Sequence, residues 1–534
     1  MAIRMVDDPQ DPNEYRDDQY NNRRNVNKPS GGGGGGLLTF LPLLLTLFRK
    51  PGGWVLLLLL AGAYFLLTQG GGCNLMDNLA AGNEEFTKGG YLDKNEFARA
   101  SVYEGLADDD LKNPLPEFVS LERFAPPRQN QGEQGSCVAW SSAYAAQTIL
   151  MSAYRGQLPA QAAFSPAYMY NQIGLDGCQG SYIIRGMQFM QQKGGVPYNL
   201  FPYDESNCSR SGSSNMDAMA SANRINGFNR LTTSEDPQGL NIRAVKEHLA
   251  QGAPVVIGAM IGGSFMHGMM GQKVWIPTDR DYSQMGFGGH AMCVIGYDDK
   301  LAGGAFQIMN SWGPEWGQNG LGWMRYSDFK EFVREAYGIN PLQKQQAALN
   351  QAFDCEVGLV MVNAQANPTG YLPLKTAGAN TFSSSTVAKG MRFKLEVKNS
   401  TDCYVYVFGQ ETDGSSYTLF PYPSAQDPAK TAYTAYCGIT GYRLFPKDKS
   451  LSPDSIGTKD YMAVVVSKTE LPWYPLNQAI NQNKNNYAAA VNSALQRYGV
   501  NRLQVSTSSK GNIRFTAPAG NNGVAYAIVE INKR

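Results

Sequence analysis

An uncharged stretch of 21 residues, from Gly52 to Gly72, is the feature that most restricts how this chain of 534 residues can be arranged. A helix needs about 20 apolar residues to cross a bilayer, so this stretch is long enough for one crossing. A second apolar segment at 37–48 is too short for a crossing and is interrupted by Pro42. We therefore expect an apolar region over residues 37–72 that contains one membrane-spanning signal anchor at about 52–72.

The charges around this region predict its orientation. Arg49 and Lys50 border the N-terminal side of the span, which places the preceding tail in the cytoplasm. That tail, residues 1–36, is polar and ends in a run of glycines, so we expect it to be disordered. It is also longer than the region that precedes the apolar core of a cleaved signal peptide. The sequence thus predicts a single-pass membrane protein whose remaining chain lies in the periplasm or at the cell surface.

Composition divides the rest of the chain. Residues 73–114 predict a stalk or a short pro-segment, residues 115–340 mix helical and strand-like patterns, and a Gln-rich linker covers 341–354. Residues 355–534 contain several short segments of alternating polarity separated by turn residues, which predicts an all-β, sandwich-like accessory domain with one helical insertion. The net charge of +1 gives no indication of nucleic-acid binding.

A cysteine lies at the start of a predicted buried helix. Residues 137–154 are rich in alanine, contain no glycine or proline, and have apolar residues at helical spacing. Cys137 is the first of them and follows a glycine-rich run. The helix dipole favours negative charge at this position, and the thiolate is the nucleophilic form of cysteine. Cys137 is therefore a candidate nucleophile for acyl transfer.

A thiol nucleophile needs a base, and the chain has only three histidines. His248 lies in an amphipathic helical pattern, where we expect it on the polar face. His267 lies in an irregular segment rich in glycine and methionine, where we expect a structural role. His290 follows several glycines and precedes the apolar segment AMCVIGYDD, which predicts a buried strand. Its place at the end of a core strand makes His290 the candidate acid/base.

Two further residues complete a catalytic set. Asn310 follows the predicted strand AFQIM, so its amide can orient the imidazole, and Trp312 can shield that hydrogen bond from water. The Gln131 side chain and the Cys137 backbone N–H can supply the two donors of an oxyanion hole.

These segments resemble the papain-like cysteine peptidase family. GEQGSCVAW is similar to the family's active-site segment, with the oxyanion Gln131 six residues before Cys137. GGHAMCVIGYDD and NSWGPEWGQNGLGWMRY are similar to its histidine and asparagine segments, in the family's order and at its spacing. Leu115 and residues 332–339 resemble the two ends of the mature enzyme, so the resemblance covers residues 115–340.

The resemblance implies an α+β fold of two lobes, one helical and one an antiparallel, β-barrel-like lobe. It implies four catalytic residues, a nucleophile, an acid/base, an orienting residue and an oxyanion donor: Cys137, His290, Asn310 and Gln131. GCQGSY is similar to the family's glycine wall, and the substrate-binding residues implied are Gly180, Ser181, Gly289 and Trp312. Ser181 replaces a glycine, which suggests a narrower or differently oriented cleft. The family's longer helical pro-region has no counterpart in residues 73–114, which leaves the restraint on activity open.

The family's disulfide partners are only partly present. Gln134 occupies the position of the usual cysteine before the nucleophile, so Cys178 lacks its family partner, as does Cys208. These two are candidates for a disulfide with each other, although sequence alone does not settle connectivity. In the accessory domain, Cys403 and Cys437 fit a disulfide and two buried thiols equally well.

The segment KLEVKNSTDCYVYVFGQETDGSSYTLFP resembles a β-rich domain of unknown function that follows bacterial peptidase domains. With the anchor expected at 52–72, the resemblances imply a membrane-anchored cysteine endopeptidase that acts on protein or peptide substrates. We expect no cofactor, and no metal because the sequence has no CxxC or paired-histidine spacing. The accessory domain is expected to recruit a substrate or a protein partner. Two alternatives stay open: a cysteine amidase or transpeptidase acting on cell-wall peptides, and a non-catalytic peptide-binding scaffold.

Overall fold

The computed structural model describes residues 2–9, 87–232, 239–342, 352–500, 504–518 and 523–534. The apolar region at 37–72, and with it the predicted anchor, lies outside these residues. Among the residues described, no helix is both long and apolar enough to cross a bilayer. The N-terminal residues and the chain after the gap belong to one compact unit.

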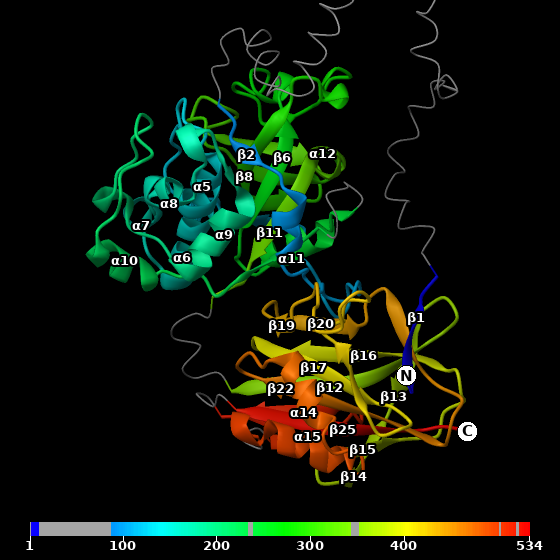
Figure 1. Ribbon diagram of the computed structural model, residues 1–534. Helices are drawn as coiled ribbons and strands as arrows, with labels where there is room; N and C mark the ends of the chain where they lie inside the picture. The colour runs from blue at the N-terminus through cyan, green and yellow to red at the C-terminus, as the bar shows by residue number, and fades with distance from the viewer. Residues whose placement is uncertain (1, 10–86, 233–238, 343–351, 501–503, 519–522) are drawn as a thin grey trace, which may run out of the picture. The chain divides into compact units, whose positions relative to one another are not determined.

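The region that resembles a peptidase contains an eight-stranded sheet in the order β5-β11-β6-β8-β9-β10-β7, with β3 paired to β8 (Figure 1). All of these pairings are antiparallel except that of β7 with β10. Its strands are β3 (Phe118–Ser120), β5 (Phe228–Arg230), β6 (Val255–Ile261), β7 (Val274–Trp275), β8 (Gly288–Asp298), β9 (Ala305–Met309), β10 (Leu321–Arg325) and β11 (Val333–Ile339). The strands predicted after His290 and before Asn310 are confirmed as β8 and β9.

A helical part lies beside this sheet. Its elements are α5 (Cys137–Ala139), η4 (Trp140–Gln147), α6 (Thr148–Arg155), α7 (Pro159–Ala162), α8 (Pro166–Ile173), α9 (Ile183–Gln192) and α10 (Ser214–Ser221), while α11 (Ile242–Ala250) and α12 (Tyr326–Phe332) pack on the sheet. The helix predicted over 137–154 is confirmed as a continuous helical run whose middle part, η4, is π-helical. It ends at Gly156, whose φ of 68° is left-handed and suits glycine.

The C-terminal region is a β-sandwich, as the sequence predicts. One sheet has the order β1-β21-β16-β12-β24-β23 with β13 and β20 attached, and the other has the order β14-β15-β25-β22-β17-β18 with β19 attached. The strands are β1 (Ile3–Asp7), β12 (Phe353–Val362), β13 (Pro368–Leu372), β14 (Leu374–Gly378), β15 (Thr381–Ser384), β16 (Arg392–Asn399), β17 (Cys403–Gln410), β18 (Ser416–Phe420), β19 (Tyr436–Cys437), β20 (Gly441–Phe445), β21 (Lys449–Pro453), β22 (Lys459–Ser467), β23 (Gln504–Thr507), β24 (Ile513–Ala517) and β25 (Val524–Asn532). Apolar side chains from both sheets form one buried core between them.

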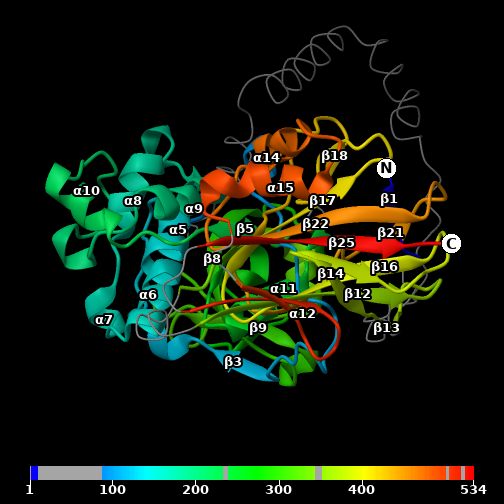
Figure 2. The ribbon, with the colours of Figure 1, turned by 90° about the horizontal axis from the view of Figure 1, so that it is seen from below.

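Two helices cover the outer face of the second sheet (Figure 2). They are α14 (Trp473–Ile480) and α15 (Tyr487–Leu495). The sequence predicts α15 from its alanine-rich pattern but misses α14, which is short and contains Pro475. That proline lies in the first turn of the helix, where a missing N–H costs nothing because the first-turn donors have no partner within the helix.

The N-terminal strand corrects the prediction that residues 1–36 form a disordered tail. Residues 3–7 form β1, which pairs antiparallel with β21. Ile3 is fully buried in the sandwich core, and Asp8 forms an ion pair with the buried Lys394 at 2.6 Å. This strand could not be predicted from the sequence because its pairing edge lies more than 400 residues away in the chain. Residues 10–36 lie outside the described part.

If β1 completes the sandwich, Ile3→Asp destabilises the protein because an unpaired carboxylate enters an apolar core. We expect a loss of about 3 kcal/mol in the free energy of unfolding, measured by denaturant titration. Arg4→Asp is the matched control, because Arg4 lies on the exposed face of the same strand. Equal stabilities for the two variants would contradict the assigned strand.

Candidate active site

Cys137 lies where a glycine-containing turn meets the buried helical run. It is the first residue of α5 and is fully buried. Its Sγ accepts a hydrogen bond from the backbone N–H of Ala291 at 3.4 Å. Because Ala291 follows His290 in β8, this contact brings the histidine motif to the thiol. The helical run behind Cys137 continues to Arg155, and its N-terminal end favours a thiolate at this position.

His290 and Asn310 come from neighbouring strands. His290 lies in β8, and Asn310 directly follows β9. The Nε2–H of His290 donates to Asn310 Oδ1 at 2.8 Å, and His290 Nδ1 has no hydrogen-bond partner among the described residues. Trp312 stacks on the imidazole with 4.4 Å between ring centroids and 24° between the planes. The hydrogen bond selects the tautomer in which Nδ1 is free to accept a proton.

Gln131 is held close to this pair by its own hydrogen bonds. Its Oε1 accepts from Ser311 Oγ at 2.6 Å, and its Nε2 donates to Gln134 O at 3.0 Å. The Tyr203 hydroxyl donates to the Gln131 carbonyl at 2.7 Å and lies 2.6 Å from Ser136 Oγ. These contacts fix the segment that carries both Gln131 and the cysteine.

A stretch of the chain that precedes the peptidase-like region crosses this site. We call residues 87–91 (TKGGY) the strap. Its Thr87 carbonyl accepts hydrogen bonds from Gln131 Nε2 at 3.1 Å and from Trp312 Nε1 at 2.9 Å. Its last two residues form β2 (Gly90–Tyr91), which pairs parallel with β4 (Ser181–Tyr182). The strap thus occupies the cleft as a bound peptide would.

All four predicted substrate-binding residues contact the strap. Gly89 of the strap donates to the Gly289 carbonyl at 3.3 Å and accepts from the Ser181 N–H at 2.9 Å. Trp312 bonds to the strap as above. A Cβ at Gly180 would lie 2.4 Å from the Gly89 carbonyl oxygen, and one at Gly289 would lie 1.9 Å from the Gly90 carbonyl oxygen. The two backbones therefore meet so closely that only glycine fits at these positions.

Comparison with known families supports the motifs. Residues 122–340 match the family described as papain family cysteine protease, and residues 386–437 match a domain of unknown function, DUF4384. Residues 122–340 are a papain-family cysteine protease domain. Both resemblances seen in the sequence are confirmed.

Individual relatives cover only part of the chain. Cathepsin K of Mus musculus is 29% identical over 231 residues, which are 40% of this chain and 62% of the cathepsin. A cathepsin L-like proteinase of Phaedon cochleariae is 28% identical over 246 residues, which are 45% of this chain and 68% of that protein. The chain thus spans less than two thirds of the mouse enzyme. The solved structure of xylellain, a cysteine protease from Xylella fastidiosa, matches 49% of this chain and 97% of its own at 23% identity and a TM-score of 0.39.

Burial beneath the strap shifts the pKa values of Cys137 and His290 in the papain-family domain. Desolvation raises the pKa of Cys137 to about 12, although the hydrogen bond from the Ala291 N–H acts in the opposite direction and lowers this pKa. Desolvation also lowers the pKa of His290 to about 4, although the hydrogen bond to Asn310 acts in the opposite direction and raises this pKa. At neutral pH the covered pair is therefore a thiol and a neutral imidazole rather than a thiolate and an imidazolium.

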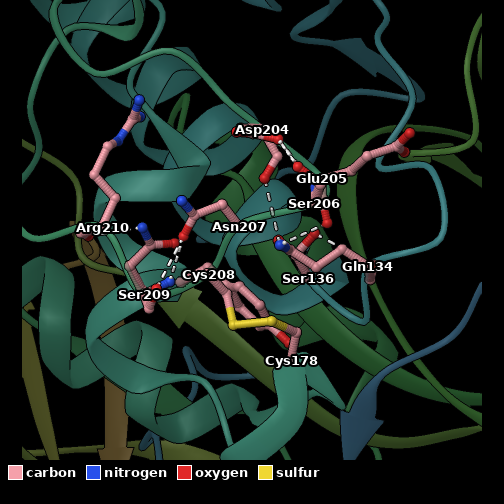
Figure 3. Close-up of a disulfide and its surroundings, with 12 residues drawn as sticks. Gln134, Ser136, Cys178, Asp204, Glu205, Ser206, Asn207, Cys208, Ser209 and Arg210 are labelled. Carbon is pink, nitrogen blue, oxygen red and sulfur yellow. Dashed lines mark hydrogen bonds between the residues drawn. A yellow bond between two sulfur atoms is a disulfide. The ribbon is translucent and has the colours of Figure 1, made fainter.

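A disulfide closes the loop next to the glycine wall (Figure 3). It joins Cys178 to Cys208 with 5.9 Å between the Cα atoms, the pairing considered from the sequence. Gln134, which stands at the position of the family's missing cysteine, instead donates to the Glu205 carbonyl at 3.2 Å. A hydrogen bond and a relocated disulfide thus tie together the loops that the family's own disulfide would join.

The other cysteines and histidines stay outside the catalytic set. Cys403 and Cys437 are opposite each other on β17 and β19 as free buried thiols, which decides between the two alternatives left open. His248 is not on a polar face as expected: it is fully buried, and its Nδ1 contacts the Ala244 carbonyl at 2.8 Å. Where the structure is described, no three metal-binding side chains group together.

The sequence missed two parts of the site. The strap has no amphipathic or helical pattern, and its one available signal was the Gly89-Gly90 pair in an otherwise polar stretch. The support of Gln131 by Ser311 and Tyr203 depends on segments that are distant in the chain. Downstream, the strap's continuation is fixed to the domain by two backbone hydrogen bonds that Arg230 makes with Ser101 and Tyr103.

Gly89→Ala would displace the strap, because the added Cβ would lie 2.3 Å from the Gly135 carbonyl oxygen. We expect Cys137 to react with an epoxide thiol reagent about tenfold faster or more, since exposure to water lowers the pKa of the thiol and increases the fraction of thiolate. Intact mass and peptide mapping measure the rate and the site.

Gly105→Ala is the control, since it lies in the same pre-domain segment and its added Cβ meets only ordinary contacts of 3.4 Å or more. Equal labelling rates in both variants would show that the strap does not protect Cys137.

Proposed function

We propose that this chain is a latent cysteine endopeptidase that hydrolyses peptide bonds through an acyl-enzyme. The observation that carries the proposal is the strap itself. The cleft over Cys137 already holds an extended polypeptide, bound through backbone hydrogen bonds to Ser181 and Gly289. A cleft that recognises peptide backbone, next to a Cys/His/Asn set in a papain-family domain, favours a peptidase over other thiol enzymes.

The proposed reaction begins with proton transfer. The Cys137 thiol gives its proton to His290 Nδ1, and the thiolate attacks the carbonyl carbon of the substrate peptide bond. Asn310 Oδ1 accepts a hydrogen bond from the Nε2–H of His290, which leaves Nδ1 free to accept the thiol proton. The imidazolium then protonates the departing amine as the C–N bond breaks, and the acyl group remains on sulfur. Water, deprotonated by His290, releases the acid and restores the thiol.

Gln131 is proposed to stabilise the oxyanion of each tetrahedral intermediate, together with the backbone N–H of Cys137. In the covered state the Gln131 Nε2–H groups are engaged by Gln134 and by the carbonyl of Thr87. Departure of the strap frees the donor that now binds Thr87. The Ser311 bond to Oε1 holds the amide in the orientation that points Nε2 towards the cleft.

The strap also explains why the proposed enzyme is latent. It blocks the cleft and keeps the catalytic pair desolvated, so both groups stay neutral at physiological pH. Activity requires that residues 87–91 leave the cleft, by proteolysis or by displacement.

The test is hydrolysis by the full-length Gly89→Ala protein of a denatured protein substrate. We expect Cys137→Ala in this background to abolish cleavage while leaving the fold intact, a loss of at least about 1,000-fold, because the nucleophile is absent. Mass spectrometry identifies the new termini, and circular dichroism checks the fold. Cys293→Ala is the control, since this free thiol is buried in β8 away from the strap contacts.

Cleavage that survives Cys137→Ala would refute the proposed mechanism. Labelling of Cys137 without cleavage of any peptide would favour a peptide-binding scaffold. Transfer of the acyl group to an added amine would favour the transpeptidase.

We further propose that the apolar region at 37–72 attaches the protein to a membrane. The pairing of β1 with β21 changes the topology expected from the sequence, because a single crossing would separate strands that share one sheet. Residues 2–9 and the chain from residue 87 onwards must lie on the same side. The apolar region would then enter and leave the bilayer on one side, or bind its surface.

Topology can be read by labelling Arg4→Cys and Ser509→Cys variants, made in a Cys73→Ser background, with a membrane-impermeant maleimide in sealed vesicles. Both positions are exposed, so each reports on its own side of the membrane. We expect both introduced cysteines to be labelled under the same condition, that is, both before detergent is added or both only after it is added. Labelling of one alone would contradict the shared side, and absence of the protein from vesicles would refute attachment.

A further inference from the structure

The strap is attached to the rest of the molecule on both of its sides. On its C-terminal side the chain continues into the papain-family domain, where the backbone of Arg230 bonds to Ser101 and Tyr103. On its N-terminal side, residues 10–86 connect the strap to β1, which pairs with β21 of the β-sandwich. One cut in the chain therefore leaves the strap attached through the other side, provided that β1 stays bound.

The edge of β21 receives β1 through both main-chain and side-chain contacts (Figure 2). The Tyr417 hydroxyl accepts a hydrogen bond from the Ile3 N–H and donates one to the Ile3 carbonyl, each at 2.8 Å. The Ala2 carbonyl accepts from the Asp454 N–H at 2.7 Å, and the Ile3 side chain is fully buried in the core. Sheet edges bind extended peptides in this way, through main-chain hydrogen bonds and pockets for alternate side chains.

A buried cation in the β-sandwich depends on β1 for its charge partner. Lys394 of β16 is 3% exposed, and its Nζ forms an ion pair with Asp8 at 2.6 Å. The carbonyls of Pro446 and Lys447 accept its other hydrogen bonds. Among the described residues, no second carboxylate forms an ion pair with Lys394. Departure of β1 would leave this ammonium group buried without a counter-charge, which is strongly unfavourable. We therefore expect β1 to stay bound when the chain behind it is cut.

We propose that the β-sandwich binds the N-terminal strand as a ligand and so retains the strap after a single cut. Cleavage on both sides of the strap is then needed to uncover Cys137. The inference rests on the proposed peptidase function, because it concerns how that enzyme is released from latency. It gives the C-terminal domain a role as the receptor that keeps the cut N-terminal segment in place.

The reason is the difference between a tethered and a separate inhibitor. While residues 10–86 link the strap to bound β1, each return of the strap to the cleft is intramolecular, at an effective concentration far above that of a free peptide. A cut between the strap and α4 (Lys94–Ala98) leaves this link intact. A cut within residues 10–86 leaves the strap joined to the papain-family domain. After both cuts the strap has only its own contacts, and dilution removes it.

The test inserts a glycine-flanked site for a sequence-specific protease after Ser30, after Leu92, or at both positions of the full-length protein in detergent. The labelling rate of Cys137 with the epoxide reports whether the cleft is covered, and uncut Gly89→Ala serves as the uncovered reference. We expect each single cut to change this rate by less than about threefold, and both cuts with dilution to raise it about tenfold or more. The uncut proteins with inserted sites are the controls and should label as slowly as the unmodified chain.

The fragment 1–30 released by the first cut measures the binding of β1 alone, because it lacks the apolar region. We expect this fragment to co-elute with the rest of the chain in gel filtration at micromolar concentration. Ile3→Asp should release it, whereas Arg4→Asp, on the exposed face of the same strand, should retain it. Circular dichroism checks that both variants are folded.

Three results would overturn the inference while leaving the peptidase function intact. They are a full rise in labelling after the cut at Leu92 alone, separation of fragment 1–30 from the unmodified strand site, and slow labelling after both cuts. The last would show that the strap needs no tether. Fast labelling of Cys137 after both cuts, with no cleavage of any peptide, would instead refute the proposed peptidase function.

Discussion

The close approach of two backbones above Cys137 is the constraint on which the described state of the site depends. Glycines on both sides make it possible: Gly89 and Gly90 in the strap, and Gly180 and Gly289 in the cleft. The approach excludes water, and the loss of water moves the thiol and imidazole pKa values in opposite directions, so that both groups are neutral. In the proposed enzyme, the backbone atoms that would bind a substrate are those that now bind the strap and keep the pair neutral.

The strap is bound through its backbone at Ser181 and Gly289, and its Tyr91 side chain also contacts the ring of Tyr182. Glycine at positions 89 and 90 lets the backbone of the strap approach the backbone of the domain closely.

The sequence predicted those parts of the structure whose sequence signals lie within a few neighbouring residues. The cysteine, histidine and asparagine motifs each lie within a few residues, and the strands and helix that carry them have clear periodicity. The missed parts depend on distant partners. Nothing in TKGGY indicates that Ser181 will pair with it, and nothing near Ile3 indicates β21. His248 was misplaced because an amphipathic pattern does not show which face a sheet will cover.

The position of β1 also affects how the chain is made. β1 is synthesised more than 400 residues before its partner β21, and the strands β22, β23, β24 and β25 of the sandwich follow β21. Loop closure over such a separation is slow, and until it happens the apolar side chain of Ile3 and an unpaired strand edge are exposed. The sandwich cannot be completed during translation in strict N-to-C order. Until β21 has been made, β1 of the nascent chain has an unpaired edge that can associate with the strands of other chains.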